Sequence, residues 1–295
     1  MKNALAFLTL LFLFTSTNLH ADEGNKNDKG DRVYELRIYS ANEGKLDALN
    51  ARFRNHTCKL FEKHGLTNVG YWVPADKSDN RLIYVISSPN RAAHTKSWKA
   101  FLNDPDWKKA YKASIKNGAL VAKIDSTFMS ATDYSPAVKS VITKDIRVFE
   151  LRTYTTAPDR LKNLHARFRD HTCKIFENHD MTNVAYWTPM DANKGKSNTL
   201  IYIISHMSKK QSGDRLEITK WNLEQAGKNW KGFARDPAWK KARAASEKDG
   251  KILAKAPHKV FLNPVDYSPM QKRRRWGDPG VETGHLWAAA IVPAV

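Results

Sequence analysis

The sequence predicts an α+β fold of two tandem ferredoxin-like βαββαβ repeats that pack sheet to sheet. Residues 33–74 align without a gap to residues 148–189, and 24 of the 42 aligned positions are identical. Similar strand-like and helix-like segments then follow in the same order in both copies. Because a period above about 100 residues is far longer than that of a solenoid repeat, we interpret the chain as a duplicated domain.

The first strand and helix of each copy follow from hydrophobic periodicity. Residues 32–39 (RVYELRIY) alternate, with Tyr34, Leu36 and Ile38 on one face, and this period of two predicts a strand. Residues 44–64 place apolar side chains at helical spacing, which predicts an amphipathic helix.

The rest of each copy completes the unit. Residues 67–73 and 81–87 are rich in β-branched and aromatic residues and flank a turn-like PADKSDN, so we expect two strands. Asp104 and Pro105 form a typical helix start, and residues 123–131 supply the fourth strand. A βαββαβ unit covers one sheet face with its helices and leaves the other bare. Two copies cover each other's bare face when their sheets pack together, with helices outside.

Outside the repeats (residues 32–138 and 146–270), the sequence predicts three further segments. Residues 1–21 have a lysine, a short apolar run and small residues before a cleavage point after Ala21, as in a secretory signal peptide. The apolar run is too short for a typical membrane span, although an uncleaved anchor is the alternative. We therefore expect a secreted or periplasmic protein. Residues 22–31 are polar and expected to be disordered, and 271–295 form a basic and then apolar tail.

Charge and cysteine content limit the function classes. The formal net charge is +19, but the lysines are spaced as on solvated helix faces, so we expect no specific nucleic-acid partner. Attraction to an anionic polysaccharide or a membrane surface stays open. The chain has two cysteines, Cys58 and Cys173, at equivalent positions, and we expect both to be free thiols, with an intermolecular disulfide as the alternative. Self-association is left undetermined.

The repeated motifs resemble a known family. The pattern YELRIY…RFRNHTCKLFEKHGLTNVGYW, and its second copy, resembles the NIPSNAP family over about residues 33–136 and 148–269. The resemblance implies the dimeric α/β-barrel superfamily, which includes cofactor-free monooxygenases, haem-handling enzymes and small-molecule-binding proteins. It also implies that ligands bind between the helices and the sheet. The NIPSNAP family itself has no settled reaction, and Cys58 and Cys173 stand where the family pattern leads us to expect an aliphatic residue.

His56 and His171 are the candidate catalytic residues. On a regular α-helix with about 100° per residue, His56 shares a stripe with Leu49, Phe53 and Leu60. We therefore expect it to point into the space between helix and sheet, where it either serves a ligand or is a structural, hydrogen-bonded histidine. Cys58 is expected to face outward.

The candidate ligand-binding residues are charged and aromatic. Glu35, Arg37 and Tyr39 share one strand face, and we expect either buried ion pairs between the two repeats or a pocket for an anionic ligand. Aromatic residues either fill the core or line a pocket for a flat apolar ligand. The full candidate set is Arg37, Tyr39, Tyr71, Trp72, Tyr84, Trp98, Arg152, Tyr154, Tyr186, Trp187, Tyr202 and Trp230.

Motifs for cofactor chemistry are not found in the sequence. It has no CxxC or HExxH spacing, no GxGxxG loop and no P-loop, so we expect neither a dedicated metal site nor a cofactor.

Three hypotheses for the function follow from the sequence. We favour a secreted protein that binds a small hydrophobic or anionic molecule in each repeat. The alternatives are a cofactor-free monooxygenase-like enzyme that uses His56 and His171, and a structural or interaction protein with a filled barrel.

Overall fold

The structure is a computed structural model that describes residues 32–138 and 145–270. The predicted signal peptide, the linker at 22–31 and the tail at 271–295 lie outside the described residues, so those statements stay predictions. In the described part of the chain, no helix is both long enough and apolar enough to cross a bilayer.

The first repeat has the predicted order of elements, with its helical regions divided into shorter segments. Asp104 caps the second part of its later helical region by accepting hydrogen bonds from the backbone N–H groups of Asp106 and Trp107, which confirms the predicted helix start. The elements are β1 Val33–Ala41, α2 Leu46–Arg52, the π-helix η1 Phe53–Thr57, α3 Cys58–Lys63, β2 Thr67–Pro74, β3 Arg81–Ser88, α4 Arg91–Asn103, α5 Pro105–Ser114 and β4 Val121–Ala131.

The second repeat follows the same plan with a longer helix after its third strand. That helix, α8, has 21 residues, whereas α4 has 13. The elements are β5 Val148–Thr155, α6 Leu161–Arg167, the π-helix η2 Phe168–Thr172, α7 Cys173–Asn178, β6 Met181–Pro189, the 3-10 helix η3 Ala192–Lys194, β7 Thr199–His206, α8 Arg215–Arg235, α9 Pro237–Ser246 and β8 His258–Pro264.

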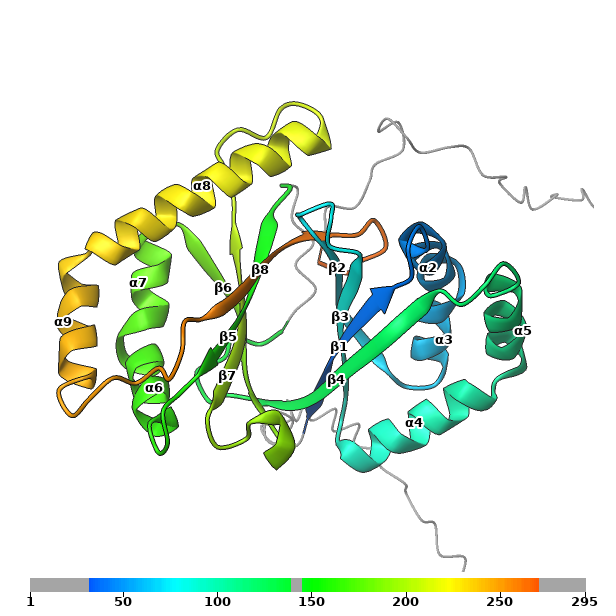
Figure 1. The fold of residues 1–295 in the computed structure, drawn as a ribbon, viewed down its shortest axis with the longest axis horizontal. Helices are drawn as coiled ribbons and strands as arrows, with labels where there is room; N and C mark the ends of the chain where they lie inside the picture. The colour runs from blue at the N-terminus through cyan, green and yellow to red at the C-terminus, as the bar shows by residue number, and fades with distance from the viewer. Residues whose placement is uncertain (1–31, 139–144, 271–295) are drawn as a thin grey trace, which may run out of the picture.

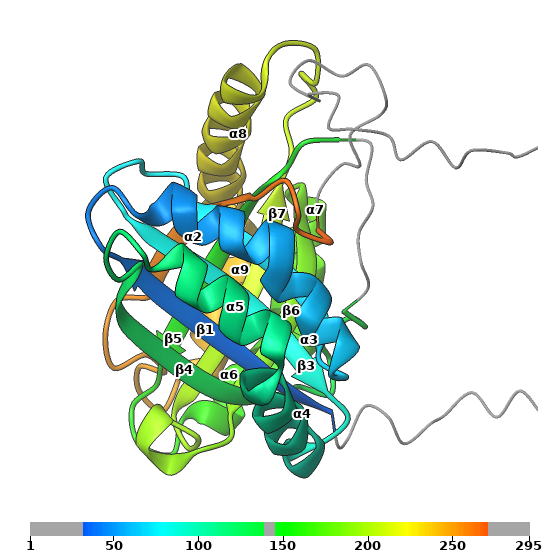
Figure 2. The same ribbon diagram turned by 90° about the vertical axis from the view of Figure 1, so that its right-hand side faces the viewer.

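The described strands close into one antiparallel barrel in the order β1-β3-β2-β8-β5-β7-β6-β4. Each repeat contributes four neighbouring strands, and the two sheets join where β2 pairs with β8 and where β4 pairs with β6. The helices of the two repeats lie on opposite outer sides of the barrel (Figure 1). In the first repeat they lie across the outer face of its sheet (Figure 2). The predicted fold class is confirmed.

The two faces of the sheet have separate cores. Inside the barrel, Leu36, Trp72 and side chains of both repeats form one buried cluster. Between sheet and helices each repeat has its own cluster, which contains Tyr39 in the first and Tyr154 in the second. The face of Glu35, Arg37 and Tyr39 therefore meets the helices. The expectation that this face forms ion pairs between the repeats is wrong, because Leu36 and its face occupy the interior.

A π-helical turn interrupts the first helix of each repeat. In η1 the N–H of Cys58 bonds to the carbonyl of Phe53, an i to i+5 bond, and Cys173 does the same with Phe168 in η2. The Thr57 hydroxyl donates to the carbonyl of Arg52, 3.3 Å away.

The π turn overturns the predicted positions of the candidate histidines. It holds one more residue than an α-helical turn, so position 57 instead of position 56 faces the sheet. His56 and His171 are exposed, whereas the threonine that follows each is buried. For the same reason Cys58 is half-buried against the helix-side core, and the expectation that it faces outward is wrong.

The segment after the last strand of each repeat docks on the other repeat. The carboxylate of Asp266, which follows β8, accepts two hydrogen bonds of 2.6 Å from the Arg54 guanidinium. Ser268 Oγ accepts from the backbone N–H of Tyr71 on β2 at 3.0 Å. Asp133 and Ser135 make the matching contacts with Arg169 and Tyr186. The repeated DYSP motif therefore joins the two halves reciprocally.

Candidate functional site

A pocket of about 630 Å³ lies between the outer face of the first repeat's sheet and its helices. It is formed mainly by aromatic and aliphatic side chains together with the buried Arg52 and the partly buried Arg37. Its lining residues are Arg37, Tyr39, Arg52, Phe53, Thr57, Phe61, Trp98, Phe101, Leu102, Trp107, Tyr111, Ile115, Ala119, Leu120, Val121, Ala122, Lys123 and Ile124.

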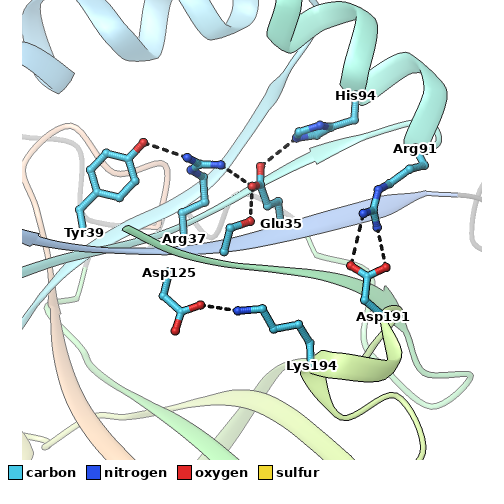
Figure 3. A network of polar contacts seen from close by, with 9 residues as sticks. Glu35, Arg37, Tyr39, Arg91, His94, Asp125, Asp191 and Lys194 are labelled. Carbon is cyan, nitrogen blue, oxygen red and sulfur yellow. Dashed lines mark hydrogen bonds and ion pairs between the residues drawn. The ribbon is translucent and has the colours of Figure 1, made fainter. Parts of the chain in front are cut away.

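Two residues of the pocket wall, Arg37 and Tyr39, belong to a polar network around β1 (Figure 3). The Arg37 guanidinium forms an ion pair with the Glu35 carboxylate and donates to the Tyr39 hydroxyl, 3.2 Å away. The Ser126 hydroxyl donates to the same carboxylate. His94 on α4 brings its Nε2 to within 2.9 Å of Glu35 Oε2, although the contact is not aligned as a hydrogen bond.

The network keeps Glu35 ionised. Burial by itself would raise the pKa of this carboxyl, but His94, Arg37 and Ser126 stabilise the charged form more strongly, so the pKa lies below its usual value. Beside the pocket, a hollow of about 580 Å³ shares Arg37 and Trp98 with it and reaches Glu35 and His94.

The second repeat builds the same charge arrangement with a different histidine. Glu150 pairs with Arg152, and His206 Nε2 lies 3.0 Å from the Glu150 carboxylate. Trp230 Nε1 donates to that carboxylate at 2.7 Å. The pKa of Glu150 is lowered in the same way, since His206 and Arg152 outweigh the effect of burial.

The two histidines come from different elements. His206 lies at the end of β7, where the first repeat has Ser88, and His94 lies on α4, where the second repeat has Ala226. An alignment of the two copies therefore does not pair them. Proximity to a buried carboxylate is a property of the folded chain, and the sequence interpretation missed both residues for that reason.

The predicted ligand-binding residues occupy three environments. Arg37, Tyr39 and Trp98 line the pocket. Trp72 and Trp187 fill the barrel interior and therefore lie on the far side of the sheet from it. The others belong to the polar network or the helix-side cores: Tyr71 and Tyr84 in the first repeat, and Arg152, Tyr154, Tyr186, Tyr202 and Trp230 in the second.

His56 and His171 do not meet the pocket. Both are exposed, so the interior position on which a catalytic role was argued is absent. His64 and His179 instead end their helices, with Nε2 2.6 Å from Asp104 and 2.7 Å from Asp236. In each repeat the histidine thereby links the end of the first helical region to the N-cap aspartate of α5 or α9.

Cys58 and Cys173 form no disulfide with each other within the chain. Burial is the main cause that raises the pKa of Cys58 to about 12 and that of Cys173 to about 11. Thiols in that state are poor nucleophiles at neutral pH. Among the described residues, no three His, Cys, Asp or Glu side chains are placed to hold a metal ion together.

Sequence reasoning also missed residues that shape the pocket, namely Arg52, Leu102, Trp107 and Tyr111. A signal for one of them was present. At Tyr111 the second copy has Arg243, so a comparison of the copies for differences would have singled out this helix.

A second, larger hollow of about 820 Å³ lies beside α8 in the second repeat. Its lining mixes Arg147 and Lys228 with Glu177 and Glu224, and it contains none of the candidate residues. Size alone therefore does not identify the site, and we place the candidate site at the aromatic pocket of the first repeat.

Fold and site together define a class: a single-chain α/β barrel of two ferredoxin-like halves, with a pocket between helices and sheet. The family model described as NIPSNAP matches residues 34–136 and 149–269, well over half of the chain. The chain belongs to the NIPSNAP family. No curated protein matches it.

Several solved structures are similar to this chain. An uncharacterised NIPSNAP-like domain protein from Burkholderia xenovorans is 14% identical, and the match covers 37% of this chain and 91% of that one, with a TM-score of 0.33. A NIPSNAP family protein of unknown function from Agrobacterium tumefaciens is 18% identical, with coverage of 36% and 93% and a TM-score of 0.33. A putative monooxygenase from Fusobacterium nucleatum is 11% identical, with coverage of 79% and 92% and a TM-score of 0.47.

Proposed function

We propose that this chain binds a small, mainly apolar molecule in the pocket of its first repeat, and that it does so outside the cytoplasm. The place of action rests on the N-terminal sequence alone. The site rests on the pocket between sheet and helices, whose volume of about 630 Å³ is in the range typical of ligand sites.

The observation that carries the proposal is the clustering of exposed apolar side chains at this pocket. Leu102, Tyr111 and Ile124 are 45%, 45% and 51% exposed, and all three line it. Among the described residues, the one other large apolar side chain with comparable exposure is Leu216 on α8, at 64%. Apolar surface gathered around a concave site is typical of a place where apolar ligands enter.

The filled-barrel hypothesis concerns the barrel interior. Trp72, Trp187 and Phe149 are buried inside the barrel and pack there with side chains of both repeats. The proposed site lies outside the barrel, between the first sheet and its helices, so a packed interior and ligand binding are compatible.

Binding of the neutral fluorophore N-phenyl-1-naphthylamine tests the proposal. Wild-type protein should enhance its emission, and Leu102→Gln combined with Ile124→Gln should weaken its affinity roughly 10-fold, because two apolar contacts are lost. Leu216→Gln is the matched control and should leave the affinity unchanged. No enhancement by the wild type, or equal weakening in both variants, would refute the site.

Native mass spectrometry of protein from its natural source would show which molecule the protein carries.

A further inference from the structure

The pocket of the first repeat contains a buried arginine that has no acidic partner. Arg52 is 6% exposed, and its Nη1 donates to Ser114 Oγ at 3.2 Å. Its guanidinium carbon lies 5.4 Å from the ring centres of both Trp107 and Tyr111. Among the described residues, no carboxylate forms an ion pair with it.

The second repeat shows how the same arginine is neutralised when a carboxylate is present. Arg167 is the counterpart of Arg52 and forms an ion pair of 3.2 Å with Glu247 as well as a hydrogen bond of 3.3 Å with Ser246. Arg243 also pairs with Glu247, at 3.0 Å. In the first repeat the positions of Arg243 and Glu247 hold Tyr111 and Ile115.

The first repeat therefore lacks both the carboxylate and the second guanidinium of this site, and its buried arginine has no acidic side chain in contact, whereas Arg167 has one. Burial lowers the pKa of both arginines; Glu247 opposes that shift for Arg167, whereas around Arg52 only tyrosines oppose it. An arginine nevertheless stays charged at neutral pH, and a buried charge without a partner is costly.

No other group in the pocket supplies the missing charge. None of its lining residues is an aspartate or a glutamate. Arg37 also lines it but already pairs with Glu35, and Lys123 is exposed to solvent. One buried positive charge, that of Arg52, remains to be balanced from outside the chain.

We infer that the ligand of this pocket is an apolar molecule with a single carboxylate, and that Arg52 binds the carboxylate. The inference rests on the proposed function and adds the chemical class of the ligand. A planar guanidinium matches a carboxylate geometrically, and one negative charge balances one positive charge, which a doubly charged phosphate monoester would exceed. The aromatic walls of Trp98, Phe101 and Trp107 accept the apolar body. The second repeat carries its own carboxylate and binds no such ligand.

Calorimetric titration with decanoate and with decanol tests this inference. The two probes share their apolar chain and differ in the charge of the head group. Wild type should bind decanoate roughly 10- to 100-fold more tightly than decanol, as expected for hydrogen bonds to a charged group. Arg52→Gln should abolish this preference, whereas the matched variant Arg167→Gln should retain it.

A second variant covers the case in which Arg52→Gln fails to fold. Ile115→Glu gives the first repeat the carboxylate that the second repeat already has, and the Arg167–Glu247 pair shows that the fold accommodates it. This variant should also lose the preference for decanoate.

The outcomes separate the two proposals. Equal binding of decanoate and decanol by the wild type, or loss of the preference in Arg167→Gln, would overturn the carboxylate inference and leave an apolar site intact. If the wild type bound neither these probes nor the neutral fluorophore, the proposed function itself would be wrong.

Discussion

At the scale of single residues, the buried glutamate on the first strand of each repeat is the most constrained group. Glu35 and Glu150 are 1% and 0% exposed, and each faces an arginine two positions along its own strand. Each also contacts a histidine, which comes from α4 in one repeat and from β7 in the other. A buried carboxylate needs opposite charge close by, and in each repeat the arginine on the same strand supplies it.

Because the pKa of each buried glutamate is lower in the folded state, we expect its contribution to stability to depend on pH. The contribution should be complete above the ordinary glutamate pKa of about 4.3 and lost as the pH falls through the lowered folded value. Glu35→Gln and Glu150→Gln should each reduce the free energy of unfolding by about 3 kcal/mol at pH 7. Their double variant should lose less stability than the wild type between about pH 5 and pH 3.

Urea denaturation at pH 7, 5 and 4 measures this effect, with the exposed Glu43→Gln as the control. If the free energy of unfolding of the double variant fell with pH as steeply as that of the wild type, the two carboxylates would contribute nothing to the acid dependence.

At the scale of elements, the π-helical turn decides which residues of the first helix meet the sheet. A π turn holds one extra residue, and the segments on either side keep their buried faces. On one side Leu49 and Phe53 face the sheet, and on the other Thr57, Leu60 and Phe61 do. The same pattern recurs in η2, so the extra residue belongs to the duplicated unit.

Removal of the exposed residue Asn55 from η1 should convert the turn to a regular α-helix. We expect the fold to survive, with a stability change within about 1 kcal/mol, because the buried faces of α2 and α3 stay aligned. Insertion of one alanine after Asn55 should instead turn α3 by about 100° and take Leu60 and Phe61 off the core, at a cost of several kcal/mol. Thermal unfolding of both variants gives the comparison. Greater damage from the deletion than from the insertion would contradict this account.

At the scale of the whole molecule, closure of the barrel depends on contacts that cross between the repeats. The pairings β2–β8 and β4–β6 and the two docked DYSP segments all join one half to the other. Each partner that the second repeat supplies has an equivalent in the first repeat, namely β4 for β8 and Asp133 for Asp266. A second copy of the first repeat therefore offers the same partners as the second repeat does.

The first repeat produced alone, as residues 32–138, should consequently form a dimer. As a monomer it would expose the interior face with Leu36 and Trp72 and the unpaired edges of β2 and β4. In the dimer, β2 would pair with β4 of the other copy, and Arg54 would meet Asp133 of that copy. Size-exclusion chromatography with light scattering measures the mass. A folded monomer would show that the contacts between repeats are dispensable.

The sequence by itself determined the duplication, the order of elements and hence the fold class. These depend on local periodicity and on short motifs such as the capped helix start at Asp104, which act within a few residues. It also placed Arg37, Tyr39 and Trp98 among the ligand-binding candidates, and they line the pocket.

Only the tertiary structure decided which face of each element meets the pocket. A stripe counted at 100° per residue carries no information about a π turn, so His56 was assigned to the wrong side. The His94–Glu35 contact and the missing acidic partner of Arg52 depend on residues far apart in sequence. Charge balance in a buried space is set by everything that packs around it, and that is fixed only when the chain has folded.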